Sequence, residues 1–156
     1  MKYSITLLLA FASFTFCASG CNKGGQTFPT QNNGSHNNQT GTKMKITVGT
    51  TVFKVTLSDN ATTAAFKAML PLTINMSELN ANEKYFYFST TLPVNASPGG
   101  NVQAGDLMLY GNNCLVLFYE SFNTSYNYTR LGKIDNVNGL KAALGIGDVS
   151  VRFELG

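Results

Sequence analysis

The chain has no tryptophan and a single histidine, and the position of that histidine removes several kinds of chemistry. His36 lies in a polar segment, so the apolar, strand-like sequence from residue 43 onward contains no histidine. A Ser-His-Asp or Cys-His arrangement needs an imidazole base to activate its nucleophile. The sequence therefore excludes both arrangements from the part of the chain that can fold.

Cysteine is almost as scarce, with three residues in all. Cys17 and Cys21 belong to the N-terminal segment, which leaves Cys114 without an intrachain disulfide partner. Cys114 begins the apolar run "CLVLFY", where a free cysteine behaves as a small core hydrophobe. A single soft ligand does not make a zinc site. We expect Cys114 to be structural, and we expect neither a metal nor another cofactor.

Charged residues make up only 12% of the chain, and the net charge of +3 overstates the charge of the folded part. Without Lys2 and Lys23, the 11 basic residues become 9 against 8 acidic residues. A nucleic-acid partner requires a clustered basic face, so we expect none. Four acids could formally form a catalytic carboxylate pair, but one acid per strand or loop is more typical of solvated surface. These acids are Glu78, Glu83, Asp106 and Glu120.

Residues 1–20 have the pattern of a secretory signal peptide. Lys2 provides a positive start, residues 5–17 are mostly apolar, and the small residues Ala-Ser-Gly precede Cys21. The apolar run is shorter than the roughly 20 residues that a membrane-spanning helix needs. The cysteine after Ala-Ser-Gly resembles a bacterial lipobox, which implies cleavage before Cys21 and lipidation of that residue. The alternative is an ordinary signal peptide followed by an incidental cysteine.

Lipidation at Cys21 would determine where the protein is found. Each buried methylene of an acyl chain contributes about 0.8 kcal/mol, so several chains anchor a protein stably to a membrane. The resemblance thus implies a lipid-anchored protein of the bacterial cell envelope, facing the periplasm or the cell surface. Residues 21–42 are rich in Gly, Asn, Gln and Thr, which predicts a flexible polar tether. A metal role for His36 in that tether is improbable.

From residue 43 to residue 156 the sequence predicts one mainly β domain. Residues 43–49 and 51–57 are β-branched runs around Gly49, typical of a hairpin. Further strands are predicted at residues 72–79, 83–89, 105–110, 114–120, 128–134 and 148–155. Short helices are predicted at residues 61–70 and 136–144, and turns or polar connections at 95–101 and 121–127. Many short strands and two helices favour a closed or nearly closed β-barrel with helices capping its ends.

Aromatic residues are the remaining chemical signal. Tyrosine combines a large apolar body with a polar tip, which suits a half-open cleft as well as the rim of a barrel. In residues 114–120 the alternation places Leu115, Leu117 and Tyr119 on one face, and one of the two faces must be core. Tyr126, Tyr128 and Arg130 are predicted to share a strand face, with Glu120 or Glu83 as the possible partner of the guanidinium.

Three separated blocks of this sequence resemble the bacterial cyclophilin-like family of small stand-alone domains. They are the helix followed by "LPL", the short block "NEKY", and "GDLMLYGNNCLVLFY" continuing to "SYNYTRLG". The resemblance runs from Met44 to Leu155 and implies an eight-stranded β-barrel closed by two helices. Fold alone does not imply function.

Catalytic cyclophilins, which this resemblance brings into consideration, are peptidyl-prolyl isomerases. Their catalytic arginine lies in a Phe-x-Arg-x-Ile-like strand followed by a Gln-Gly-Gly-Asp-like stretch, and this sequence contains neither. Arg130 could serve by a different route as the only catalytic candidate.

Two functional hypotheses follow from these features. The first is an envelope-anchored module that binds a peptide or a small ligand, and the second is a weak peptidyl-prolyl isomerase that assists folding of envelope proteins. A purely structural accessory domain is a third, weaker hypothesis. The candidate ligand-binding residues are Tyr85, Tyr110, Phe118, Tyr119, Glu120, Tyr126, Tyr128 and Arg130.

Overall fold

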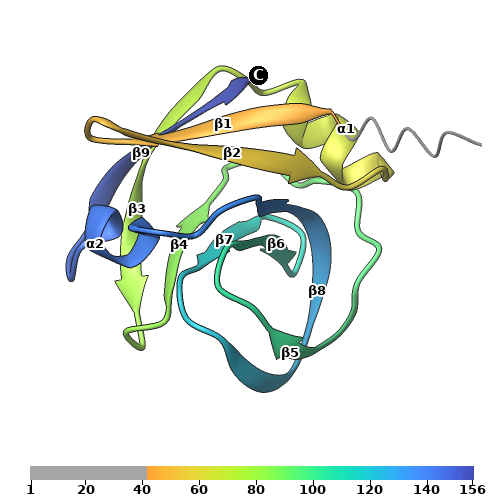
Figure 1. Ribbon diagram of the computed structural model, residues 1–156. Helices are drawn as coiled ribbons and strands as arrows, with labels where there is room; N and C mark the ends of the chain where they lie inside the picture. The colour runs from red at the N-terminus through yellow and green to blue at the C-terminus, as the bar shows by residue number, and fades with distance from the viewer. Residues whose placement is uncertain (1–41) are drawn as a thin grey trace, which may run out of the picture. The chain divides into compact units, whose positions relative to one another are not determined.

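The computed structural model describes residues 42–156 (Figure 1). The predicted signal peptide, the predicted lipidation site Cys21, and His36 lie outside the described residues, as does the predicted tether except for Thr42. No helix within residues 42–156 is long and apolar enough to cross a membrane.

Nine strands and two short helices make up the fold. In chain order they are β1 (Lys43–Val48), β2 (Thr51–Leu57), α1 (Ala61–Lys67), β3 (Leu72–Leu79), β4 (Glu83–Tyr87), β5 (Ser97–Val102), β6 (Asp106–Tyr110), β7 (Cys114–Phe118), β8 (Phe122–Ile134), α2 (Leu140–Leu144) and β9 (Val149–Leu155). Every pairing between strands is antiparallel. The predicted mainly β class is confirmed, as are the two short helices.

Eight of the strands form a closed ring. Their order is β2, β1, β9, β3, β4, β7, β6 and β8, and the pairing of β8 with β2 closes the ring. At this closure Leu57 lies opposite Gly132. A Cβ at Gly132 would lie 2.7 Å from the backbone oxygen of Thr56, so only glycine allows the two strands to approach this closely. The ring agrees with the eight strands that the family resemblance implies.

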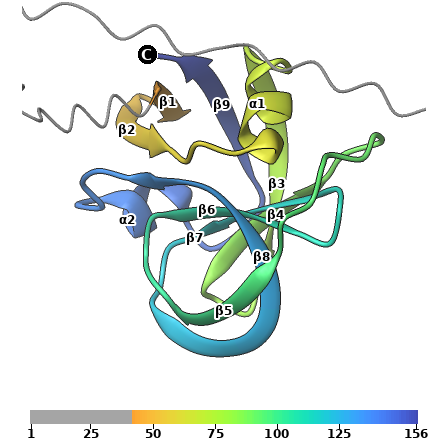
Figure 2. The same cartoon turned by 90° about the vertical axis from the view of Figure 1, so that its right-hand side faces the viewer.

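The ninth strand, β5, corrects the prediction of a plain turn at residues 95–101 and a polar connection at 121–127. β5 pairs with the first half of β8, with a register shift between Pro98 and Gly100. Figure 2 shows β5 and the first half of β8 on the side of the domain away from β1 and β2. Glycine, which predicted a turn, serves close strand packing instead, because a Cβ at Gly99 would lie 2.7 Å from Thr124 Cγ2.

Both helices are shorter than predicted. Asn60 caps α1 by accepting the Thr63 N–H at 2.8 Å, as expected for an N-cap. The helix ends at Lys67 rather than at residue 70, because the chain must leave the helical conformation before Pro71. The second helix begins only at Leu140, since Gly139 has a left-handed backbone conformation with φ of 80°.

Two apolar clusters lie on opposite faces of β4, β7 and β6. The inner cluster fills the ring and includes Phe66 of α1 together with Leu140 and Leu144 of α2. The outer cluster lies under β5 and the first half of β8; its buried members are Val102, Met108, Cys114, Val116, Phe118 and Tyr128. Both faces of β7 are therefore core, where alternation alone required only one. The outer cluster provides the base on which the candidate site is built.

Candidate functional site

A cavity of about 340 Å³ opens on the outer face of β4, β7 and β6, next to the first half of β8. This volume lies within the range of small-molecule sites, which is roughly 300–1,000 Å³. We call it the tyrosine pocket because five tyrosines line it. The lining residues are Leu79, Asn80, Asn82, Glu83, Tyr85, Tyr87, Tyr110, Cys114, Val116, Phe122, Thr124, Tyr126 and Tyr128.

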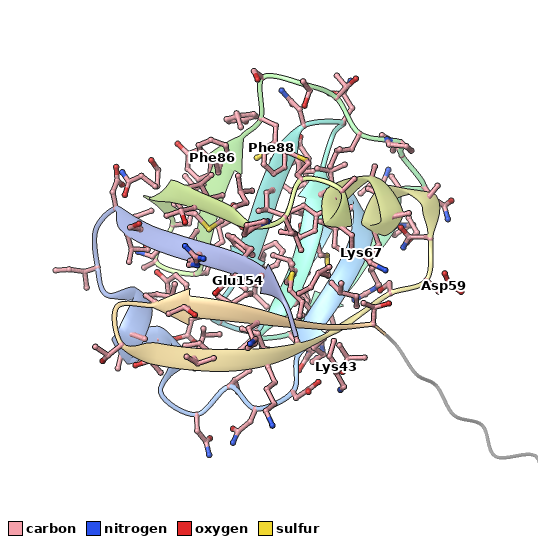
Figure 3. All side chains as sticks on the ribbon, turned by 90° about the horizontal axis from the view of Figure 1, so that it is seen from above. Lys43, Asp59, Lys67, Phe86, Phe88 and Glu154 are labelled. Carbon is pink, nitrogen blue, oxygen red and sulfur yellow. The ribbon has the colours of Figure 1, made fainter. Side chains whose placement is uncertain are left out.

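Strand alternation explains which side chains of β4 reach the pocket. Glu83, Tyr85 and Tyr87 point to the outer face, and successive side chains of a strand point to opposite faces. Phe86 and Phe88, labelled in Figure 3, therefore point inward, where their rings pack edge to face with centroids 5.5 Å apart. The two tyrosines thus lie on the outer face of the sheet and the two phenylalanines on the inner face.

The ring contacts of the tyrosines form two groups, Tyr85 with Tyr87 and Tyr110 with Tyr126 and Tyr128, and these include a buried floor and an exposed rim. Tyr128 belongs to the floor, packing edge to face on Phe118 at a centroid distance of 5.5 Å. Tyr110 packs on Tyr128 at 5.6 Å and on Tyr126 at 5.8 Å. Tyr126 is 61% exposed at the rim. The floor fixes the rim tyrosines in place, while the rim remains open to a ligand.

Glu83 is the only charged side chain among the described residues that line the pocket. It is 9% exposed, and burial, with a smaller contribution from nearby Glu78, raises the pKa of Glu83 to about 7. Asn82 also lines the pocket, and its Oδ1 is buried without a hydrogen-bond partner. The floor thus holds one titrating carboxyl group and one unsatisfied acceptor.

The other ionisable groups of the floor are neutral near pH 7. Burial, followed by the charge of Glu83, raises the pKa of Tyr128 to about 12. Burial also raises the pKa of the Cys114 thiol. Cys114 is buried, in agreement with the expected structural role, and its protonated thiol is a poor nucleophile.

Four of the eight predicted ligand-binding residues line the pocket: Tyr85, Tyr110, Tyr126 and Tyr128. Phe118 supports them from beneath and is completely buried. Tyr119 lies on the inner face of the sheet, where its hydroxyl donates to Glu78 Oε1 at 2.8 Å. Glu120 pairs with Lys141 on the surface. Of the eight predicted residues, only these four tyrosines therefore line the pocket.

Arg130 lies in a second cavity, a broad polar one of about 940 Å³. Lys43, Asp59 and Lys67, labelled in Figure 3, are among its other lining residues. The predicted partners Glu120 and Glu83 are both wrong. Arg130 Nη1 lies 3.5 Å from Asp106 Oδ2, which belongs to the adjacent strand β6. Lys133 Nζ approaches the other oxygen of Asp106 at 3.2 Å.

Sequence reasoning missed three lining residues that matter for the chemistry of the pocket, Asn82, Glu83 and Tyr87. Two of the four acids expected on the solvated surface, Glu83 and Asp106, are in fact buried. A signal for Glu83 was present, because it alternates in register with Tyr85 and Tyr87. Glu83 lies opposite Phe118 of β7, a cross-strand neighbour that strand alternation does not reveal.

A second buried polar cluster lies on the inner side of β3 and β4. None of its residues lines the tyrosine pocket. Lys84 is completely buried, and its Nζ donates to Glu78 Oε2 at 2.5 Å. The same ammonium donates to the carbonyl oxygens of Gly145 at 2.9 Å and Gly147 at 2.6 Å. This cluster fixes the loop after α2 against β3 and β4, which is a structural role. Within residues 42–156 no group of three or more His, Cys, Asp or Glu side chains is arranged to hold a metal.

The sequence model of the cyclophilin-like family matches residues 46–154, from within β1 to within β9. The chain belongs to the cyclophilin-like family. This cyclophilin-like domain also resembles the solution structure of a hypothetical protein from Archaeoglobus fulgidus, with a TM-score of 0.55 and 20% identity. That similarity covers 74% of this chain and 95% of the archaeal chain. At this identity it supports the fold alone. No curated protein matches the chain significantly.

Proposed function

We propose that this cyclophilin-like domain binds a peptide segment or a small ligand in the tyrosine pocket, and that Cys21 anchors it by lipid to the bacterial cell envelope. The observation that carries the binding proposal is a concave cavity of about 340 Å³ with five tyrosines. Tyrosine contributes large contact area at low cost in side-chain entropy, and it is enriched where proteins bind other molecules.

A structural explanation of the tyrosines accounts for the floor better than for the rim. Tyr128 and Phe118 are buried, so packing alone explains them. Tyr87 and Tyr126 are more than half exposed, and packing within the domain does not require an aromatic side chain at either position. The rim therefore supports a binding role.

The binding proposal is tested with the whole proposed mature chain, beginning at residue 21 and carrying Cys21→Ser. The probes are acetylated tetrapeptide amides in which one central residue is varied through all natural side chains, proline included. We expect chemical-shift changes confined to the pocket residues for a subset of these peptides. Tyr126→Ala is expected to weaken binding about tenfold by removing rim contact area.

The matched control for this experiment is Val52→Ala, which also truncates an exposed apolar side chain but lies on β2, outside the pocket. It should leave the affinity unchanged. The proposal fails if no peptide shifts the pocket resonances, or if the two variants weaken binding equally.

The isomerase alternative has less support than binding. It rested on Arg130 acting together with the tyrosine-rich strand face, but Arg130 lies in the other cavity, paired with Asp106. Tyr126 and Tyr128 of the same strand line the tyrosine pocket. Isomerase activity stays a prediction, which a protease-coupled proline-isomerisation assay tests: catalysis lost in Arg130→Ala would favour it over binding.

Lipid anchoring rests on the lipobox-like residues before Cys21. In bacterial cells supplied with a labelled fatty acid, the wild-type chain is expected to carry the label and to remain with the membrane fraction. Cys21→Ser is expected to abolish labelling, because the acyl chains have no other attachment point in this mechanism. Cys17→Ser is the control and should retain the label. Label that persists in Cys21→Ser contradicts the proposal.

A further inference from the structure

Glu83 is buried in the floor of the tyrosine pocket without a cationic partner. None of the ion pairs among residues 42–156 includes it. Lys84, its neighbour in the chain, points to the opposite face of β4 and is bound by Glu78 and two carbonyl groups. A carboxylate removed from water is costly unless a positive charge or hydrogen-bond donors compensate it. The domain itself supplies no such cation at this site.

The aromatic surface around Glu83 is also suited to a cation. The face of a tyrosine ring carries negative electrostatic potential, and a cation placed over it is stabilised by about 0.5–2 kcal/mol. Tyr110 and Tyr126 meet at 82°, and Tyr85 and Tyr87 at 76°. In each pair the edge of one ring packs on the face of the other, and all four residues line the pocket.

We infer that the group entering the tyrosine pocket is a protonated alkyl amine, whose ammonium lies against Glu83 and whose methylene groups contact the tyrosine rings. This inference rests on the proposed binding function and names the ligand chemistry of the same pocket. A lysine side chain of a peptide and a free alkyl amine share this chemistry.

Anionic and neutral ligands fit the pocket less well. No lysine or arginine is among the described lining residues, so an anion would face the carboxylate of Glu83 without a compensating charge. A neutral apolar ligand would displace water from that carboxylate and leave it unpaired, which is the costly case. The ammonium ligand removes both penalties.

The test compares ligands that differ only in charge, using the whole mature chain with Cys21→Ser. One pair is n-butylammonium and n-butanol; the other is an acetylated tetrapeptide amide with a central lysine and the same peptide with that lysine Nε-acetylated. At pH 8 we expect each ammonium probe to bind about tenfold or more tightly than its neutral counterpart. Tighter binding of the peptide than of n-butylammonium identifies a lysine side chain as the source, and the reverse identifies a free amine.

Glu83→Gln keeps the shape of the site and removes its charge. This variant is expected to lose the preference for the ammonium probes while still binding the neutral ones. Glu120→Gln, a surface acid paired with Lys141 and outside the pocket, is the matched control and should retain the preference. Neutral probes that bind as tightly as the ammonium probes overturn the inference while leaving the binding function intact. If none of the four probes binds, the binding function itself fails.

The pH dependence gives a second measurement. Ammonium affinity is expected to rise between pH 6 and pH 8, as Glu83 with its raised pKa becomes ionised. The alkyl amine stays protonated throughout, since its pKa is about 10. The groups that influence Glu83 do not titrate in this window. The pKa of Glu78 is lowered, whereas those of Cys114, Tyr119 and Tyr128 are raised. An affinity that does not change with pH, or changes equally in Glu83→Gln, contradicts the inference.

Discussion

Replacing Lys84 with alanine is expected to lower the free energy of unfolding by about 3 kcal/mol, the lower end of the range for breaking a buried ion pair. The loss arises because Glu78 would lose its counter-ion, and the carbonyl groups of Gly145 and Gly147 would lose their donor. The lower end applies because the Glu78 side chain is 21% exposed and water can partly solvate it. Urea denaturation of the wild type and the variant measures the difference.

The control for this prediction is Lys133→Ala. Lys133 also pairs with a carboxylate, Asp106, but its own side chain is 53% exposed, so its removal should cost less than about 1 kcal/mol. The double variant Lys84→Met with Glu78→Gln should recover part of the stability, because it removes the uncompensated charge. A loss in Lys84→Ala no larger than in Lys133→Ala would show that the buried cluster is not stabilising.

Raising the pH is expected to destabilise the domain through Glu83, by on the order of 3 kcal/mol in total. The pKa of Glu83 is about 7 in the folded protein and near 4.5 for an ordinary glutamate. Between these values the folded protein keeps a proton that the unfolded chain releases. The stabilisation from this proton is therefore complete below about pH 4.5 and is lost as the pH rises through 7.

Comparison of unfolding curves for the wild type and Glu83→Gln isolates this contribution. Other carboxyl groups act in the opposite direction: the pKa values of Glu78 and Asp135 are lowered, so their contributions are lost at acid pH. The variant keeps these groups and should gain stability relative to the wild type as the pH rises from 5 to 8. Glu120→Gln should follow the wild type. A constant difference between wild type and Glu83→Gln across this range contradicts the prediction.

A carboxyl group that destabilises the free domain at neutral pH is typical of a binding site rather than of a core. Perturbed ionisable groups cluster at functional sites, where the cost to stability is retained for the sake of a ligand. The acidic groups of this domain differ in their partners. Glu78 pairs with Lys84 and Asp106 pairs with Arg130 and Lys133, whereas Glu83 in the pocket has no cationic partner among residues 42–156.

The sequence by itself predicted most of the strands, because a strand with one buried face shows alternating apolar and polar residues. Residues 51–57 and 149–155 alternate cleanly, and both form strands at the predicted positions. The number of short strands and helices favoured a closed or nearly closed barrel, and the resemblance of three sequence blocks to a family implied that it has eight strands. Four pocket residues, Tyr85, Tyr110, Tyr126 and Tyr128, were also predicted, because clustered tyrosines are easily recognised in a sequence.

Tertiary structure alone decided the second layer and the chemistry of the pocket. The segments at residues 97–102 and 122–127 lack a continuous apolar pattern, and they form strands because each pairs with the other, from Ser97 opposite Tyr128 to Val102 opposite Phe122. Once they fold over β7, its outer face becomes core and Glu83 is withdrawn from water. The same packing places Arg130 with Asp106 and away from the tyrosines. Local patterns report which face of a strand is apolar, but burial of a single charged residue depends on which distant segment comes to cover it.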